Sequence, residues 1–281
     1  MSKKTGGNTT VASAGSVAAA ADSRRVWPDG PPPGEALSRE PSVGARLRLI
    51  YRLLLRRFGP RGWWPGDSPF EVMVGAVLTQ NTAWRNVEKA MVNLRAAGLL
   101  LPERMLETPV AELAELVRPS GFYKLKADRL RNMTGAVLSF GAGGGRPAIL
   151  DLPADVLRES LLRVKGIGRE TADCVVLYAA GRPSFVVDAY TRRLLRRHSL
   201  ASGREDYDAV RGWFMGHLGP DAGLYNEYHA LIVAAGHRHC GPKSPDCAAC
   251  PLGTDPWLRP DEKTDPAGGR RRGGKARRTG G

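Results

Sequence analysis

The sequence lacks the features that place a protein in a membrane or outside the cell. No apolar run approaches the roughly 18 residues that a membrane-spanning helix needs. The N-terminus has no compact apolar segment after Lys3-Lys4, because residues 17–21 are too short and too rich in alanine. The four cysteines include three crowded into one loop, which argues against a disulfide framework. We therefore expect an intracellular, cytoplasmic protein.

Acidic residues are also scarce relative to basic ones. The 281 residues include 42 Lys and Arg but only 28 Asp and Glu, so the net charge is +14 and the isoelectric point is about 10.1. This balance favours a polyanionic partner, for which basic side chains supply salt-sensitive affinity without sequence preference. The length allows one large or two small domains with an ample core.

Composition separates an ordered middle from two ends. Residues 1–40 are rich in small residues and proline, and residues 257–281 become rich in glycine and basic residues. Such segments bury too little apolar surface to offset their ordering entropy, so both are predicted to be disordered. The basic tail is either simply solvated or a tether along phosphates. Between the ends we expect a core over residues 41–239 and a cysteine-containing loop over 240–256.

The core shows helical periodicity and no long alternating run of the kind that indicates a sheet. Glycine or proline marks most boundaries between the helical patterns. We predict an all-α fold. The expected helices cover residues 43–58, 70–78, 84–97, 110–117, 124–140, 154–164, 169–180, 188–197, 206–218 and 223–239.

The most informative stretch is Leu161 to Asp188. Gly166-Ile167-Gly168 forms a two-glycine turn between helical patterns, and glycine permits positive φ and close approach of a ligand. The helix that follows presents unpaired N–H groups and the positive end of its dipole, which suits a phosphate. Asp188 stands alone behind the apolar run 185–187. Each feature has a plain alternative, an ordinary turn and a helix N-cap, but together they indicate an enzyme that grips a nucleic-acid backbone.

Several motifs in the same order resemble the helix-hairpin-helix (HhH-GPD) DNA glycosylases of the endonuclease III superfamily. The hairpin match is Val164 to Ala172, and the others are at residues 68–71, 78–82, 118–123, 126–127 and 185–188. The resemblance spans roughly residues 47–250. It implies two lobes, a contiguous helical barrel that carries the hairpin and a second lobe built from N- and C-terminal helices. It also implies a monomer that binds double-stranded DNA in the cleft between them.

The resemblance assigns roles to the segment around the hairpin. Asp188 would stabilise the positive charge that develops on the sugar and orient the attacking water. Bifunctional relatives carry a nucleophilic Lys where this chain has Glu170, which cannot form a Schiff base, so a monofunctional enzyme is expected. The backbone contacts would come from Lys165, Gly166, Ile167, Gly168 and Arg169.

Aromatic residues suggest the substrate. Trp63-Trp64-Pro65, with the 78–82 motif, resembles the 3-methyladenine glycosylase branch, and flat rings can stack on a flipped cationic purine. Tyr123 could add another wall, and one Trp could instead plug the lobe interface. Gln80 and Asn81 would fill the gap left by the extruded nucleotide, or merely cap a helix.

Cys240, Cys247 and Cys250 have the spacing of the iron–sulfur loop that ends many family members. A fourth cysteine is expected where this chain has Pro256, so the [4Fe-4S] ligand set is incomplete. Asp255, His237, His239 or water could complete it, the loop could bind zinc as Cys3His, or it could hold no metal. Glu227 and His229 lie two residues apart on a helix, and we expect both to be interface or core-edge groups with satisfied hydrogen bonds.

These observations predict a base-excision repair glycosylase that flips a damaged base, with an alkylated purine favoured, and hydrolyses its N-glycosidic bond. One alternative is an endonuclease III-like glycosylase and lyase for oxidised pyrimidines. The other is a non-catalytic helix-hairpin-helix module that only binds DNA.

Overall fold

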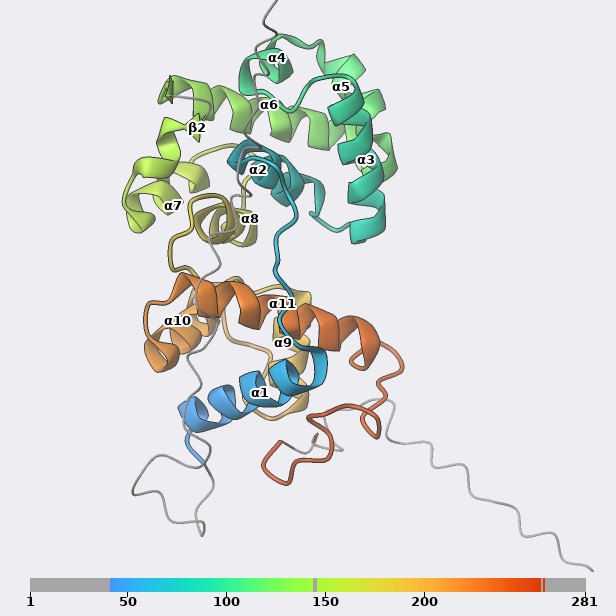
Figure 1. Cartoon of the computed structure of the whole chain (residues 1–281), viewed down its shortest axis with the longest axis vertical. Helices are drawn as coiled ribbons and strands as arrows, with labels where there is room; N and C mark the ends of the chain where they lie inside the picture. The colour runs from blue at the N-terminus through green and yellow to red at the C-terminus, as the bar shows by residue number, and fades with distance from the viewer. Residues whose placement is uncertain (1–40, 144–145, 259, 261–281) are drawn as a thin grey trace, which may run out of the picture.

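The helices form two groups along the long axis of the molecule (Figure 1). The computed structural model describes residues 41–143, 146–258 and 260, so the expectations for residues 1–40 and for most of the basic tail lie outside the described residues. None of the described helices combines the length and the apolar character needed to cross a bilayer.

The upper lobe is contiguous in sequence and is built around a fully buried helix, α2. Every residue of α2 is buried, as its apolar character on all sides requires. The helices of this lobe are α2 (Pro69–Leu78), α3 (Trp84–Ala96), α4 (Pro102–Glu107), α5 (Val110–Leu116), α6 (Tyr123–Ser139), α7 (Ala154–Leu162) and α8 (Arg169–Cys174). Shorter elements are η1 (Arg118–Ser120), η2 (Ala148–Asp151), the π-helical turn η3 (Val175–Ala179) and a two-residue antiparallel ladder of β1 (Ala142–Gly143) with β2 (Arg146–Pro147).

The lower lobe joins the first helix to the last three. It contains α1 (Val43–Phe58), α9 (Ala189–Arg197), α10 (Tyr207–Leu218) and α11 (Ala222–Arg238). The Tyr228 hydroxyl donates to the Leu47 carbonyl at 2.7 Å, which fixes α11 on α1. Phe185 stacks on Phe214 with ring centroids 3.7 Å apart. The two-lobed all-α prediction is confirmed.

Most helix boundaries follow the capping residues. Ser68, Asp206 and Asp221 accept hydrogen bonds from the first turns of α2, α10 and α11. All ten predicted helices are present, although the one over 169–180 is divided into α8 and η3. The short helix α4 was not predicted, because six residues show too little periodicity to stand out from a loop.

The chain passes between the lobes through segments 59–68 and 180–188, and the first is visible as the loop linking α1 to α2 (Figure 1). A buried ion cluster also joins the lobes. Asp173 on α8 is completely buried and lies 2.9 Å from Arg158 on α7 and 3.2 Å from Arg211 on α10. Arg158 reaches Asp208 on α10 at 2.6 Å as well.

Replacing Asp173 with alanine is expected to lower the free energy of unfolding by about 3 kcal/mol, because a half-broken buried pair leaves uncompensated charge. Urea denaturation measures the change. The control Asp155→Ala removes an exposed acid from α7 and should change stability by less than about 0.5 kcal/mol. Equal effects of the two substitutions would show that the cluster does not hold the lobes together.

Candidate active site

Asp188 occupies the N-cap of α9, where segment 180–188 enters the lower lobe. Its Oδ1 atom accepts a hydrogen bond from the Thr191 amide at 2.7 Å, so the capping interpretation is correct. Its Oδ2 atom lies 3.4 Å from Nε2 of His229, and 13% of the side chain is exposed. Capping uses only Oδ1 and leaves Oδ2 facing His229, so a capping role and a catalytic role of Asp188 are compatible.

The surroundings of Asp188 keep it ionised. Burial by itself would raise its pKa, but the charge of His229 and the hydrogen bond from the Thr191 amide outweigh burial and hold the pKa below its usual value. The group is therefore a carboxylate at neutral pH, as charge stabilisation at a sugar requires.

His229 on α11 was not expected in the site. Its Nδ1 atom bonds with the Tyr178 hydroxyl at 2.6 Å, while its buried Nε2 faces Asp188 without meeting hydrogen-bond geometry. The expectation of a fully hydrogen-bonded interface group was therefore wrong for His229. It was right for Glu227, whose carboxylate accepts from the Arg61 amide at 2.7 Å. No local pattern marks His229, since only the packing of α11 against α9 brings it to Asp188.

Glu170 lies in the first turn of α8, near Asp188. Partial desolvation and the negative charge of Asp188 raise its pKa to about 7, against the opposing effects of His229 and Arg192. This side of the site therefore offers a second carboxyl group, in which the neutral and ionised forms are both populated near pH 7. It offers no amine at the position where a lyase lysine was considered.

The predicted tryptophans belong to a larger aromatic cluster. Trp63 and Trp64 lie 5.2 Å apart, and Trp84 packs against them at 4.7 and 5.2 Å between ring centroids. Trp64 also contacts Tyr178 at 5.2 Å. Because Tyr178 bonds to His229, contacts run without a break from Trp63 to Asp188. Sequence reasoning missed Trp84 and Tyr178, which read as ordinary helix residues.

Tyr123 is placed differently from the tryptophans. Its ring lies under the Arg118 guanidinium, 5.3 Å away. Phe122, its neighbour, was not a candidate, yet it is 67% exposed and has φ of 46°. An exposed phenylalanine in the left-handed region is unusual, and the Gly121-Phe122 tip presents it to solvent directly before α6.

The two amide side chains of the polar loop after α2 have different surroundings. The Gln80 side chain donates to Thr171 Oγ1 at 2.9 Å and to the Gly166 carbonyl at 3.2 Å, and its oxygen accepts from Arg129. Asn81 is exposed, with φ of 52°. Gln80 therefore joins the loop to the hairpin, and Asn81 is the amide that faces outward.

The geometry of the hairpin explains why glycine occupies positions 166 and 168. Gly166 has φ of 93°, and a Cβ there would lie 2.5 Å from Arg129 Cγ. Space around Gly168 is open, as close approach of a backbone requires. Lys165 and Arg169 are exposed, whereas Ile167 is buried and anchors the turn in the core.

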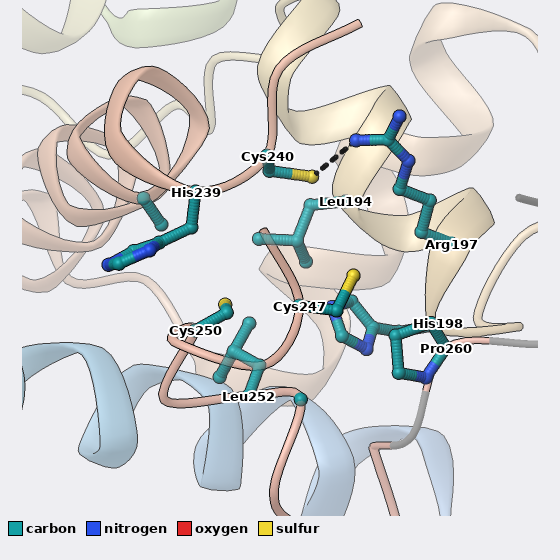
Figure 2. Close-up of a pocket in the computed structure, with 11 residues that line it drawn as sticks. Leu194, Arg197, His198, His239, Cys240, Cys247, Cys250, Leu252 and Pro260 are labelled. Atoms are coloured by element: carbon teal, nitrogen blue, oxygen red, sulfur yellow. Dashed lines mark hydrogen bonds between the residues drawn. The ribbon is translucent and has the colours of Figure 1, made fainter. Parts of the chain in front are cut away.

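The three cysteines of the loop line one small pocket (Figure 2). Arg197 donates to Cys240 Sγ at 3.0 Å, and both ring nitrogens of His239 are buried without hydrogen-bond partners. Within the described residues, no three His, Cys, Asp or Glu side chains converge as a metal site. With Pro256 at the fourth position and Arg197 on Cys240, the residues do not fit a four-thiolate cluster, and no step of the chemistry is assigned to one. The remaining cysteine, Cys174, is buried in the core.

A two-lobed helical fold, with a glycine hairpin and an ionised Asp capping a helix beside an aromatic cluster, is the arrangement expected for a base-excision glycosylase. The chain belongs to the HhH-GPD superfamily of base excision DNA repair proteins, whose family model matches residues 74–216. It is 43% identical over 203 residues to a Methanocaldococcus jannaschii protein named as a candidate DNA repair glycosylase, covering 72% of this chain and 92% of that protein. It is 29% identical to endonuclease III of Thermotoga maritima, over 73% of this chain and 89% of that protein.

Solved structures agree on the fold. The structure of H. pylori 3-methyladenine DNA glycosylase bound to 1,N6-ethenoadenine is similar with a TM-score of 0.61 and 32% identity, over 70% of this chain and 98% of that one. A non-covalent endonuclease III–DNA complex is similar with a TM-score of 0.64, over 80% of this chain and 96% of that one. Its 22% identity supports the fold alone.

Proposed function

We propose that this protein removes alkylated purines from double-stranded DNA by hydrolysis of the N-glycosidic bond, without cutting the strand. The observation that carries the proposal is the unbroken series of contacts from Trp63 through Trp64, Tyr178 and His229 to Asp188. This series connects flat rings to an ionised carboxylate, the two groups that the proposed reaction needs. The resemblance to a 3-methyladenine glycosylase structure supports the same substrate class.

The chemistry follows from the charge of the groups. As the bond from C1′ to the base breaks, its electrons leave with the base, and a cationic alkylated purine departs as a neutral molecule without needing a proton. Asp188 stabilises the cation that develops on the sugar. Water then adds to C1′, and the carboxylate orients that water and accepts its proton. Nε2 of His229 faces the second oxygen of Asp188 at 3.4 Å.

Glu170 supports hydrolysis rather than lyase chemistry. A lyase needs an amine that attacks C1′, and a carboxyl group cannot form the Schiff base. Lys165 lies on the other side of the turn, and its backbone carbonyl accepts from Asn132 at 3.1 Å. Its exposed ammonium is suited to a phosphate contact.

In this proposal, DNA binding uses three exposed segments of the upper lobe, which are the hairpin and the loops that carry Asn81 and Phe122. The hairpin at 165–169 grips the backbone through amides and the exposed Lys165 and Arg169. Asn81 and Phe122 stand on neighbouring exposed tips, so we assign them the task of filling the space left by the extruded nucleotide. An amide can bond to the orphaned partner base, and an aromatic ring can stack between bases.

One assay separates the candidate functions. Purified protein is incubated with duplexes that carry 3-methyladenine, 1,N6-ethenoadenine, uracil, an oxidised pyrimidine or an abasic site, with and without alkali. We expect release of the alkylated purine, strand scission only after alkali, and no protein–DNA adduct with borohydride. Scission without alkali on the oxidised pyrimidine would instead support the endonuclease III-like lyase. Binding without release of any base would support the non-catalytic module.

A further inference from the structure

Lys126 is a buried lysine in the first turn of α6. Only 1% of its surface is exposed, although lysine is among the residues least often buried without a partner. Its ammonium donates to the Leu78 carbonyl at 2.7 Å, to the Ser120 carbonyl at 2.7 Å and to Thr82 Oγ1 at 2.5 Å. All three protons therefore meet neutral oxygens, two from the end of α2 and the loop after it and one from the segment before α6.

Ion pairing does not account for this burial. Desolvation, reinforced by the charge of Arg129, lowers the pKa of Lys126 to about 8. The protonated form is thus favoured over the neutral form less strongly here than in water. The ammonium can satisfy three acceptors at once, because no neutral side chain donates three hydrogen bonds in three directions. It therefore fixes the relative positions of the groups that accept these bonds.

The segments that Lys126 joins carry the exposed tips of the upper lobe. Leu78 and Thr82 bracket the loop that presents Asn81, and Ser120 immediately precedes the tip that presents Phe122. The Thr82 hydroxyl also donates to the Ser120 carbonyl at 2.6 Å, which closes the connection between the two loops. The ammonium of Lys126 and this Thr82–Ser120 hydrogen bond therefore hold the two loops together.

Side chains on the same side of α6 as Lys126 also contact the hairpin. Arg129, one turn after Lys126, bonds to Gln80 and packs against Gly166, and Asn132 donates to the Lys165 carbonyl at 3.1 Å. Positions three apart on a helix are neighbours, so these side chains form one row. Through this row, α6 relates the hairpin to the two tips.

We propose that Lys126 is a positioning residue for nucleotide extrusion, which holds Asn81 and Phe122 at the spacing needed to enter one step of the duplex together. The inference rests on the proposed glycosylase function. Without the ammonium, the carbonyls of Leu78 and Ser120 face each other with no shared donor, and the two tips separate. Chemistry at Asp188, which lies on the other lobe's helix, is left intact.

The test compares one lesion in two contexts. Lys126→Met keeps the apolar stem and removes the donors. In single-turnover base release from a duplex with a paired lesion, we expect a loss of about 100-fold, the size associated with misplacement of about 1 Å. On the same lesion opposite an abasic site, where extrusion needs little help, we expect a rate within about threefold of the wild type. Thr82→Val, which removes one acceptor, should show the same pattern with a smaller loss.

Controls separate this role from a general defect. Lys89→Met removes an exposed lysine from α3 and should behave as the wild type on both substrates. Equal losses of Lys126→Met on both substrates, or no loss on either, would overturn the proposal. Fluorescence of 2-aminopurine beside the lesion reports unstacking on binding and needs no cleavage. If the wild type releases no base, the proposed function fails, while weaker unstacking by Lys126→Met would still support the positioning role.

Discussion

Asp188→Asn is expected to reduce single-turnover base release by about 10³-fold, because an amide supplies neither negative charge for the sugar cation nor a base for water. Asparagine is as good an N-cap as aspartate, so α9 should still begin at the same residue. The variant should also bind damaged duplex as tightly as the wild type. The measurement is the rate of base release under enzyme excess, with binding followed separately.

The matched control is Asp206→Asn. Asp206 caps α10 with a hydrogen bond from the Ala209 amide at 2.7 Å, as Asp188 caps α9, but it lies at a helix end without His229. Wild-type activity in this control assigns the loss in Asp188→Asn to its chemistry rather than to capping. If Asp188→Asn released base at more than about a tenth of the wild-type rate, Asp188 would not have the catalytic role, since general-base contributions begin near about 10²-fold.

The pH dependence of the wild type adds a second readout. The pKa of Asp188 is held below its ordinary value, so its carboxylate persists as the pH falls through the usual range of aspartate, near about 3.9. We expect the Asp188-dependent activity to decline only below that range, provided that the protein stays folded. A decline centred above pH of about 5 would show that His229 does not stabilise the ionised form.

Trp63→Ala is expected to reduce release of a cationic alkylated purine by about 10- to 100-fold, the cost of one lost base–aromatic stack. The ring contacts of Trp63 are with Trp64 and Trp84, whereas Trp64 contacts Trp63, Trp84 and Tyr178 and also lies against Gly75. Trp63 is therefore the better candidate for stacking on a base. A cation gains more from a ring face than a neutral base does, so the loss should be larger for 3-methyladenine than for 1,N6-ethenoadenine.

Trp257→Ala serves as the control, because Trp257 is 38% exposed, directly follows the cysteine loop and lies outside the aromatic cluster. Trp63→Phe should recover most of the activity, since a smaller ring still stacks. Equal losses for both bases would mean that the tryptophan only shapes the pocket. An unchanged rate for Trp63→Ala, with reduced thermal stability, would assign it to the lobe interface.

The sequence predicted the helices of the fold better than it predicted the residues of the site. The helices could be predicted because periodicity and capping are local, as Ser68 before α2 and Asp188 before α9 illustrate. Asp188, the hairpin glycines and Trp63-Trp64 could be proposed because each sits in a short motif. His229, Tyr178 and Trp84 could not, since each lies inside an ordinary helical pattern and reaches the site only through packing.

Gln80 and Asn81 show the same limit within one loop. They are adjacent in sequence and chemically alike, and only the tertiary structure turns Gln80 toward the hairpin and leaves Asn81 exposed. Lys126 likewise reads as one basic residue among many until burial reveals its three acceptors.

The sequence by itself determined an all-α chain with a glycine-containing hairpin suited to binding a phosphate. It also determined a lone carboxyl group twenty residues after Gly168 and a net charge of +14. Those features depend on neighbours within a few turns of chain or on composition. The tertiary structure alone decided which side chains meet Asp188, which amide faces outward and which lysine is buried. Such contacts join residues from separate helices, and their geometry arises only when the lobes pack.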